Sequence, residues 1–146
     1  MIEKIMSKNL IVLDVDSSIY DVAKVMKEKD IGFIPISQSN KIIGVLTDRD
    51  IVTRILANKD DKIAGYLSID PIKISYDASI EEALEKMKEH KIKRLLVEKN
   101  KKLIGILSLS DLINQDNKNL LETIQNIYEI NRNTDYYNTK IDEFEL

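Results

Sequence analysis

The chain of 146 residues contains no cysteine and no tryptophan, four glycines, two prolines and a single histidine. Without cysteine it forms neither a disulfide nor a thiolate metal site, which suits a reducing compartment. The single histidine, His90, excludes a cluster of imidazole ligands. No apolar run approaches the ~20 residues of a membrane-spanning helix, and the first residues lack the apolar core of a signal peptide. We therefore expect a soluble, cytoplasmic protein with no membrane partner and no metal site.

The charge is distributed unevenly along the chain. Residues 116–146 carry three basic and seven acidic side chains, whereas residues 1–115 carry nineteen basic and eighteen acidic ones. A nearly neutral body exerts little long-range attraction on nucleic acid, and its basic residues are interspersed with acidic ones. We therefore expect no nucleic-acid partner.

The sequence contains an internal repeat with an offset of 61 residues. Residues 18–51 and 79–112 align without a gap and share eleven identities in thirty-four positions, where this composition predicts about two or three. A copy of about sixty residues buries too little surface to be robust alone, so we expect the two to share one core. We place repeat 1 at residues 1–60, repeat 2 at 61–115 and a C-terminal segment at 116–146.

Each copy is predicted to fold in the order β-α-β-β-α, which gives an α+β fold with helices packed on small sheets. The first helices should begin at Ser18 and Ser79, where Ser-x-x-Asp and Ser-x-x-Glu predict capping boxes. Their apolar stripes are Ile19, Val22, Ala23 and Met26, and Ile80, Ala83, Leu84 and Met87. The predicted strands are 10–13, 33–36 and 42–46, then 72–74, 94–97 and 103–107. The second helices should span 48–57 and 109–114.

The C-terminal segment differs from the repeats. Residues 117–131 predict a helix with the apolar stripe Leu120, Leu121, Ile124, Ile127 and Tyr128, followed by a polar and acidic tail. We favour a helix that packs on the body. The alternative is a segment that binds a partner.

One motif recurs at the end of each copy: a glycine, two aliphatic residues, a hydroxyl residue and, three positions later, an aspartate. The two instances run from Gly44 through Thr47 to Asp50 and from Gly105 through Ser108 to Asp111. Backbone N–H groups at such a strand-to-helix turn favour phosphate, and the carboxylate can accept from a ribose diol. The glycine lets another group approach the backbone closely. The same residues also form ordinary capping boxes, and this alternative stays open.

The duplicated unit resembles a tandem pair of cystathionine-β-synthase (CBS) domains, often called a Bateman module. The segment 44–51 resembles the strand-to-helix signature of that family, and 32–36 resembles its central strand with a proline. Residues 5–7 are similar to the family's opening. The resemblance covers about residues 5–113.

The resemblance implies a pseudo-twofold arrangement of the repeats with two clefts that bind adenosine-containing ligands. In each cleft the aspartate would hold ribose hydroxyls, and strands of the other repeat would contact the base and phosphate. One cleft would place Val45, Thr47 and Asp50 opposite Ile72, Lys93 and Arg94. The other would place Ile106, Ser108 and Asp111 opposite Asn9, Ile11, Phe33 and Ile34.

The two implied clefts differ in charge. Arg94 lies where many CBS domains have a phosphate-binding arginine, and Lys93 adds a second cation, whereas Gly32 and Phe33 at the aligned positions carry none. We predict that the Asp50 cleft is the better site for phosphorylated ligands and that the Asp111 cleft is weak, empty or tuned to a less charged ligand. A surface pair flanking a strand is the alternative interpretation of Lys93 and Arg94.

The resulting hypothesis is a non-catalytic regulatory module that binds AMP, ADP or ATP, senses energy or a metabolite, forms a homodimer and acts on an unknown protein effector. S-adenosylmethionine, NAD and cyclic dinucleotides contain the same adenosine group, so the motif does not distinguish among these ligands. The alternative is a ligand-independent dimeric adaptor. An enzyme is disfavoured by the lack of a cysteine nucleophile, of a site histidine and of a phosphate-binding glycine loop. No cofactor is required.

Overall fold

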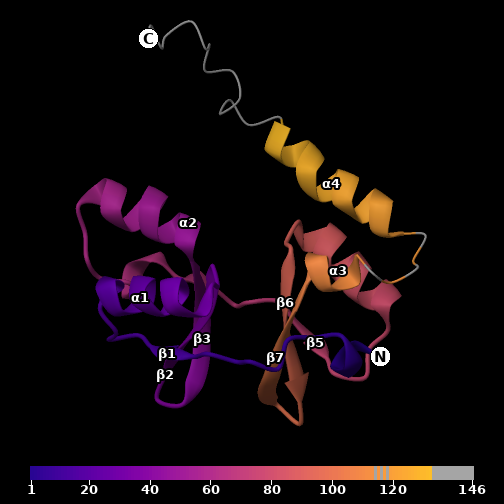
Figure 1. Cartoon of the computed structure of the whole chain (residues 1–146), viewed down its shortest axis with the longest axis horizontal. Coiled ribbons are helices and arrows are strands. Elements are labelled where there is room, and N and C mark those ends of the chain that lie inside the picture. Colours follow the sequence, from indigo (N-terminus) through magenta and orange to yellow (C-terminus); the bar gives the residue numbers. More distant parts are fainter. Residues whose placement is uncertain (114, 116, 118, 133–146) are drawn as a thin grey trace, which may run out of the picture. The chain divides into compact units, whose positions relative to one another are not determined.

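The computed structural model describes residues 1–113, 115, 117 and 119–132, which belong to two compact units (Figure 1). The repeat-1 unit is Asn9–Pro71, and the repeat-2 unit joins Met1–Lys8 to the chain from Ile72 onward. Most of the predicted acidic tail lies outside the described residues. The α+β fold class is confirmed, because each unit places helices beside a small mixed sheet.

The repeat-1 unit contains a four-stranded sheet in the order β1-β2-β3-β4, in which only the β1–β2 pair is parallel. Its elements are β1 (Leu13–Asp14), α1 (Ile19–Lys29), β2 (Phe33–Gln38), β3 (Lys41–Thr47), α2 (Asp48–Asp50) and β4 (Ser68–Ile69). The helical path of α2 continues through a π-helical segment, Ile51–Ile55, and a 3-10 turn, Leu56–Asn58. The helix predicted over residues 48–57 is therefore confirmed.

The repeat-2 unit contains a three-stranded sheet in the order β5-β6-β7. Its elements are β5 (Lys73–Ser75), α3 (Ile80–His90), β6 (Arg94–Lys99), β7 (Lys102–Ser108) and α4 (Leu120–Arg132). Short 3-10 turns occupy Ile2–Lys4 and Leu109–Leu112. The second of these replaces the helix predicted to begin at Leu109, and its regular part ends at Leu112.

Serine side chains cap both long helices as predicted, but neither cap is the complete capping box that the sequence indicated. The Ser18 hydroxyl accepts from the Asp21 N–H at 3.0 Å, and the Ser79 hydroxyl accepts from the Glu82 N–H at 3.1 Å. The Asp21 carboxylate accepts from the Ser18 hydroxyl at 2.8 Å rather than from the backbone N–H of a capping box. The helices end at residues in the left-handed region, Asp30 and Lys91.

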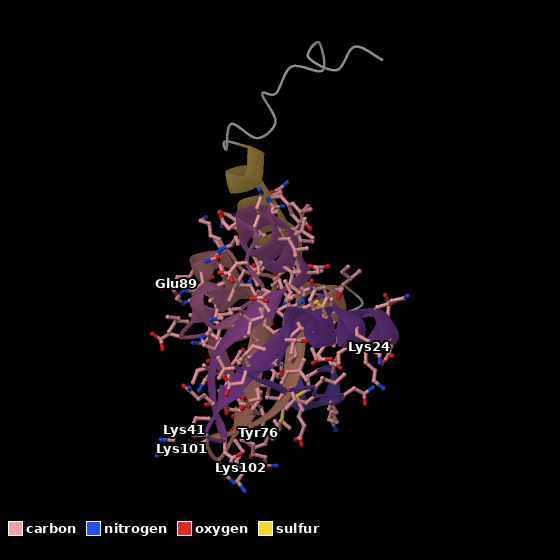
Figure 2. The ribbon with its side chains drawn as sticks, turned by 90° about the vertical axis from the view of Figure 1, so that its left-hand side faces the viewer. Lys24, Lys41, Tyr76, Glu89, Lys101 and Lys102 are labelled. Carbon is pink, nitrogen blue, oxygen red and sulfur yellow. The ribbon has the colours of Figure 1, made fainter. Side chains whose placement is uncertain are left out.

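The two hairpins turn through pairs of residues with positive φ. Ser39 and Asn40 connect β2 to β3, and Asn100 and Lys101 connect β6 to β7. Positive φ at both central residues defines the type I′ turn, whose twist matches that of antiparallel strands. Figure 2 labels Lys101 and its neighbour Lys102 at this end of the hairpin, and the exposed residues Lys24 of α1 and Glu89 of α3.

Buried apolar side chains form two clusters, one in each unit, so the single shared core expected from the sequence is wrong. In α1 the stripe Ile19, Val22 and Met26 is buried as predicted, but Ala23 is exposed. Each core is completed from outside its own repeat. Ile63 is buried in the repeat-1 unit and Ile2 in the repeat-2 unit.

Each sheet is bordered by the segment that precedes the other repeat in the sequence. Strand β4 pairs with β3 through Gly44 and Ile69, and Ser7 forms the corresponding bridge to Ile106, with N···O distances of 2.9 and 3.0 Å. A Cβ on Gly44 would lie 2.8 Å from the Ser68 carbonyl oxygen, and one on Gly105 would lie 2.7 Å from that of Ser7. The group that approaches these glycines is therefore the chain's own backbone.

Pro35 explains why β1 is shorter than β5. In the repeat-2 unit the Leu96 N–H donates to the Ile72 carbonyl at 3.0 Å. Pro35 occupies the equivalent position of β2 and has no N–H, so pairing in the repeat-1 unit begins only at Leu13. The strand predicted at 10–13 is displaced for this reason. Pro35 lies in an inner strand of this sheet, and it is tolerated there because the β1–β2 pairing begins beyond it.

Helix α4 packs on α3 (Figure 1), which confirms the expectation of a helix on the body. Lys88 of α3 and Glu122 of α4 form an ion pair at 2.7 Å, which raises the pKa of Lys88 above its usual value. The covered face carries Leu120, Thr123, Ile124 and Ile127. The predicted stripe is wrong at Leu121 and Tyr128, whose side chains are exposed.

Candidate functional site

The first candidate carboxylate, Asp50, lies one turn after the end of β3. Its Oδ2 accepts from the Thr47 N–H at 3.1 Å and from the Thr47 hydroxyl at 2.9 Å. The Thr47 hydroxyl oxygen in turn accepts from the Asp50 N–H at 3.1 Å. The two residues therefore form a complete capping box, and this box fixes the orientation of the carboxylate.

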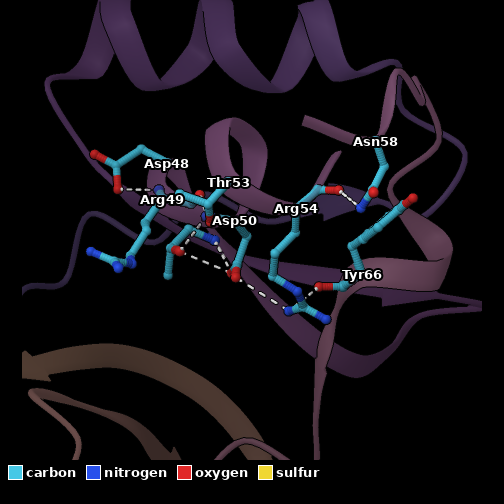
Figure 3. A network of polar contacts seen from close by, with 8 residues as sticks. Asp48, Arg49, Asp50, Thr53, Arg54, Asn58 and Tyr66 are labelled. Carbon is cyan, nitrogen blue, oxygen red and sulfur yellow. Dashed lines mark hydrogen bonds and ion pairs between the residues drawn. The ribbon is translucent and has the colours of Figure 1, made fainter. Parts of the chain in front are cut away.

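The other oxygen of Asp50 is held by Arg54. The Arg54 Nη1 lies 3.3 Å from Asp50 Oδ1 and also donates to the Tyr66 carbonyl at 3.1 Å (Figure 3). The guanidinium carbon lies 5.9 Å from the centroid of the Tyr66 ring. The Asp50 side chain is 15% exposed, against 46% for Arg54, so the carboxylate lies mostly beneath the guanidinium and the cap.

Tyr66 is fixed from its far end. Its hydroxyl donates to Asp60 Oδ2 at 2.9 Å, and this bond raises the pKa of Tyr66. The pKa of Asp60 is lowered, first by the Lys62 N–H and then by the Tyr66 hydroxyl. Asp50, Arg54, Tyr66 and Asp60 thus form one connected polar chain, which the sequence analysis did not predict.

The second candidate carboxylate, Asp111, repeats the cap but lacks the arginine. Its Oδ2 accepts from the Ser108 N–H and from the Ser108 hydroxyl, both at 2.7 Å. The Ser108 hydroxyl oxygen also lies 2.7 Å from Ser110 Oγ. Gln115 stands 61 residues after Arg54 in the sequence, so the second repeat has no arginine at the aligned position. Within the described part of the chain, no side chain or N–H donates to Asp111 Oδ1.

The two predicted cations follow each other at the start of β6. Both side chains are exposed, and Arg94 pairs in the strand register with Ser108. The Lys93 ammonium lies 4.3 Å from the centroid of the Tyr128 ring, so helix α4 holds it by a cation–π contact. Nothing in the local sequence indicates that Lys93 and Tyr128 come into contact.

The remaining candidate residues divide between the units. Val45, Asn9, Ile11, Phe33 and Ile34 belong to the repeat-1 unit with Thr47 and Asp50, whereas Ile72 and Ile106 belong to the repeat-2 unit with the other candidates. Val45 and Ile34 are buried in their strands, Asn9 is exposed, and the others are half-buried. Each implied cleft combines residues of both units, so the clefts and the pseudo-twofold axis stay predictions. The structure brings together the hydroxyl–carboxylate pairs within each unit.

The described residues offer neither a metal site nor a membrane-spanning helix. They contain no group of three or more acidic, histidine or cysteine side chains placed to hold a metal ion. None of the helices in the same residues combines the length and the apolar character of a membrane span.

Comparison with known proteins gives a family and a fold. A family model described as "CBS domain" matches twice, at residues 2–57 and 59–117. An uncharacterized protein of Bacillus subtilis, YlbB, is 36% identical over 116 residues, which cover 76% of this chain and 78% of that protein.

Two solved structures share the fold and contain ligands according to their descriptions. The CBS domain pair of protein MJ0100, in complex with 5′-methylthioadenosine and S-adenosyl-L-methionine, has a TM-score of 0.70 at 24% identity and covers 77% of this chain and 91% of that one. CBSX2 in complex with AMP has a TM-score of 0.67 at 23% identity, with coverage of 77% and 92%.

Proposed function

The chain belongs to the CBS domain family, whose members are generally regulatory and non-catalytic, and from this premise we propose that it is a regulatory module that binds adenosine-containing nucleotides. AMP, ADP or ATP is the proposed ligand, and its occupancy would report energy state or metabolite level to a protein effector. Ligand binding would act by favouring one of two states of the module, in proportion to the difference in affinity for them.

The observation that carries the proposal is the duplicated hydroxyl–carboxylate pair, Thr47 with Asp50 and Ser108 with Asp111. In both pairs the cap occupies Oδ2 and leaves acceptor capacity on Oδ1. A vicinal diol is a donor suited to that capacity. The ligands of the two structural neighbours, 5′-methylthioadenosine, S-adenosyl-L-methionine and AMP, have the adenosine ribose in common.

A homodimer is part of the proposal. Val52 and Leu56 are exposed at 62% and 50% and stand four residues apart, on one face of the helical path that follows α2. An apolar helical face of this kind is suited to burial against a second copy.

The second candidate function is a ligand-independent dimeric adaptor. The completeness of both capping boxes favours it, because the boxes give all four residues a structural role without any ligand. In that case the family fold would serve only to present surfaces to a protein partner.

Calorimetric titration of the wild-type protein with AMP, ADP, ATP and S-adenosylmethionine distinguishes the nucleotide-binding module from the ligand-independent adaptor. The double variant Asp50→Asn, Asp111→Asn keeps amide oxygens that can still accept at the caps, but it loses the charge-assisted bonds to ribose. Affinity should fall by about 1.5–3 kcal/mol, roughly ten- to a hundredfold. Native mass spectrometry of the same samples would report the dimer and any bound ligand.

Ser79→Ala is the matched control, since it removes a helix cap of the repeat-2 unit that is not a candidate ligand residue. It should lower stability by about 1 kcal/mol and leave nucleotide affinity unchanged. Absence of binding by every nucleotide, with dimerisation retained, would favour the adaptor.

A further inference from the structure

The two candidate carboxylates differ in the acceptor capacity they have left. An ionised carboxylate offers about four lone-pair positions. At Asp50 the cap uses two of them and Arg54 a third, whereas at Asp111 the cap uses two and no described residue uses Oδ1. A ribose diol donates two hydrogen bonds. Asp111 can therefore accept both in its present state, and Asp50 can accept both only after Arg54 has moved.

Arg54 is not a loosely placed surface arginine. It contacts Asp50, the Tyr66 carbonyl and the Tyr66 ring, and Asp60 fixes the ring at its hydroxyl. Displacing the guanidinium from Asp50 therefore breaks a bond in a chain whose members position one another. In the repeat-2 unit the regular turn ends at Leu112, and Gln115, which stands 61 residues after Arg54 in the sequence, lies in a bend beyond it.

The backbone carbonyls of the first strands differ in the same direction. The Ile72 carbonyl already accepts from the Leu96 N–H, whereas Pro35 at the position equivalent to Leu96 has no N–H, and no described residue donates to the Ile11 carbonyl. The sequence analysis assigned Ile11 to the Asp111 cleft and Ile72 to the Asp50 cleft.

The Asp50 cleft is predicted to be the better site for phosphorylated ligands because of the cations Lys93 and Arg94 at the start of β6. Lys93 is engaged with Tyr128 at 4.3 Å, so part of its favourable interaction is already made within the protein. The positive charge at the start of β6 favours binding of phosphate, whereas the number of lone-pair positions left on each carboxylate affects binding of ribose. These two contributions to affinity can be measured separately.

We propose that Arg54 is a specificity-determining residue that makes the repeats unequal, so that an adenosine ligand occupies the Asp111 carboxylate first and the Asp50 carboxylate only when Arg54 releases it. This inference rests on the proposed function. The order predicted from the sequence concerned phosphorylated ligands, whereas the order proposed here concerns the ribose. The ligand class is a nucleoside with a free 2′,3′-diol, and the uncharged member, adenosine, is the appropriate probe because it has no phosphate to attract Arg54.

The test is a titration of adenosine into wild type, Asp111→Asn, Asp50→Asn and Arg54→Gln, the last copying the residue of the other repeat. Asp111→Asn should weaken the tighter site about tenfold or more, and Asp50→Asn should leave it unchanged. Arg54→Gln should strengthen the weaker site. In the Asp111→Asn background, Arg54→Gln should restore binding that the further change Asp50→Asn removes. Dideoxyadenosine, which lacks the diol, should bind neither carboxylate.

An NMR readout makes the assignment independent of variant stability. The Thr47 and Ser108 amides donate to the two carboxylates, so adenosine should shift the Ser108 amide signal first in the wild-type protein. Earlier movement of Thr47, or weakening by Asp50→Asn alone, would overturn the inference and leave the proposed function intact. Failure of adenosine and AMP to bind any of the proteins would overturn both.

Discussion

At the scale of single residues, the polar chain from Asp50 to Asp60 links a candidate ligand residue to the surface. Its outer end is the bond from the Tyr66 hydroxyl to Asp60, supported by N–H donors from Asp61 and Lys62. Because these donors favour the ionised carboxylate, the pKa of Asp60 is lowered relative to the unfolded chain. The position of the Tyr66 ring, and through it that of Arg54, should therefore depend on pH.

The first prediction concerns acid sensitivity at Asp60. A lowered pKa in the folded state gives stability that is present above the unfolded value of about 4 and is lost as the pH falls through the folded value. Asp60→Asn should therefore be less stable than wild type at pH 6. The difference in free energy of unfolding should shrink as the pH falls below about 4 towards the lower pKa of the folded state. Denaturant midpoints measured at each pH test this.

Tyr66→Phe is the control for Asp60→Asn, because it keeps the ring against Arg54 and removes only the hydroxyl. It should reduce the acid dependence in part, since the Lys62 N–H remains the largest cause of the lowered pKa. Parallel pH profiles for wild type and Asp60→Asn would contradict the assignment.

At the scale of elements, the difference between β1 and β5 depends on one backbone N–H. Leu96→Pro should remove the donor to the Ile72 carbonyl and destabilise the repeat-2 unit by about 1–3 kcal/mol, because the strand loses a backbone hydrogen bond and the carbonyl loses its partner. The reverse change, Pro35→Leu, introduces an N–H opposite Ile11 and should lengthen β1. Amide hydrogen exchange at position 35 measures it directly. A fast-exchanging amide there would show that Pro35 does not set the length of β1.

The elements also show which parts of the fold local sequence determines. Serine caps and apolar spacing placed α1 and α3 correctly, because those signals act within one or two turns. The displaced β1 and the segment β4 depend on partners distant in the sequence, which a local pattern does not contain. Only the alignment of Ser7 with Ser68 at the same offset of 61 hinted at the second.

For the candidate site, the sequence identified both hydroxyl–carboxylate pairs but not what surrounds them. The spacing Thr47 to Asp50 is sufficient to predict the cap. The Arg54 bond to the Tyr66 carbonyl requires the chain to return from residue 66 to the helix after α2, and the contact of Lys93 with Tyr128 requires α4 to be in place. Tertiary structure therefore decides how much of each side chain remains available to a ligand.

At the scale of the whole molecule, each core receives an apolar side chain from the segment that precedes the other repeat in the sequence. The N-terminal segment holds Ile2 in the core of the repeat-2 unit, and the segment before β5 holds Ile63 in the core of the repeat-1 unit. Each segment makes its contacts with a repeat that it does not directly precede. A repeat cut out of the sequence at its own boundaries would therefore lack one apolar side chain of its core and one partner at the edge of its sheet.

Ile2→Ala and Ile63→Ala form a matched pair that tests this exchange, because the two side chains are buried to the same degree at equivalent repeat positions. Each should cost about 2–4 kcal/mol, the range for truncating a buried isoleucine. The loss from Ile2→Ala should increase amide exchange first in α3 and β6, more than seventy residues away, and that from Ile63→Ala first in α1 and β2. If Ile2→Ala instead loosened α1 and left α3 protected, the N-terminal segment would belong to its own repeat. Equal loosening of both units by either variant would mean that the exchange couples them so strongly that they unfold together.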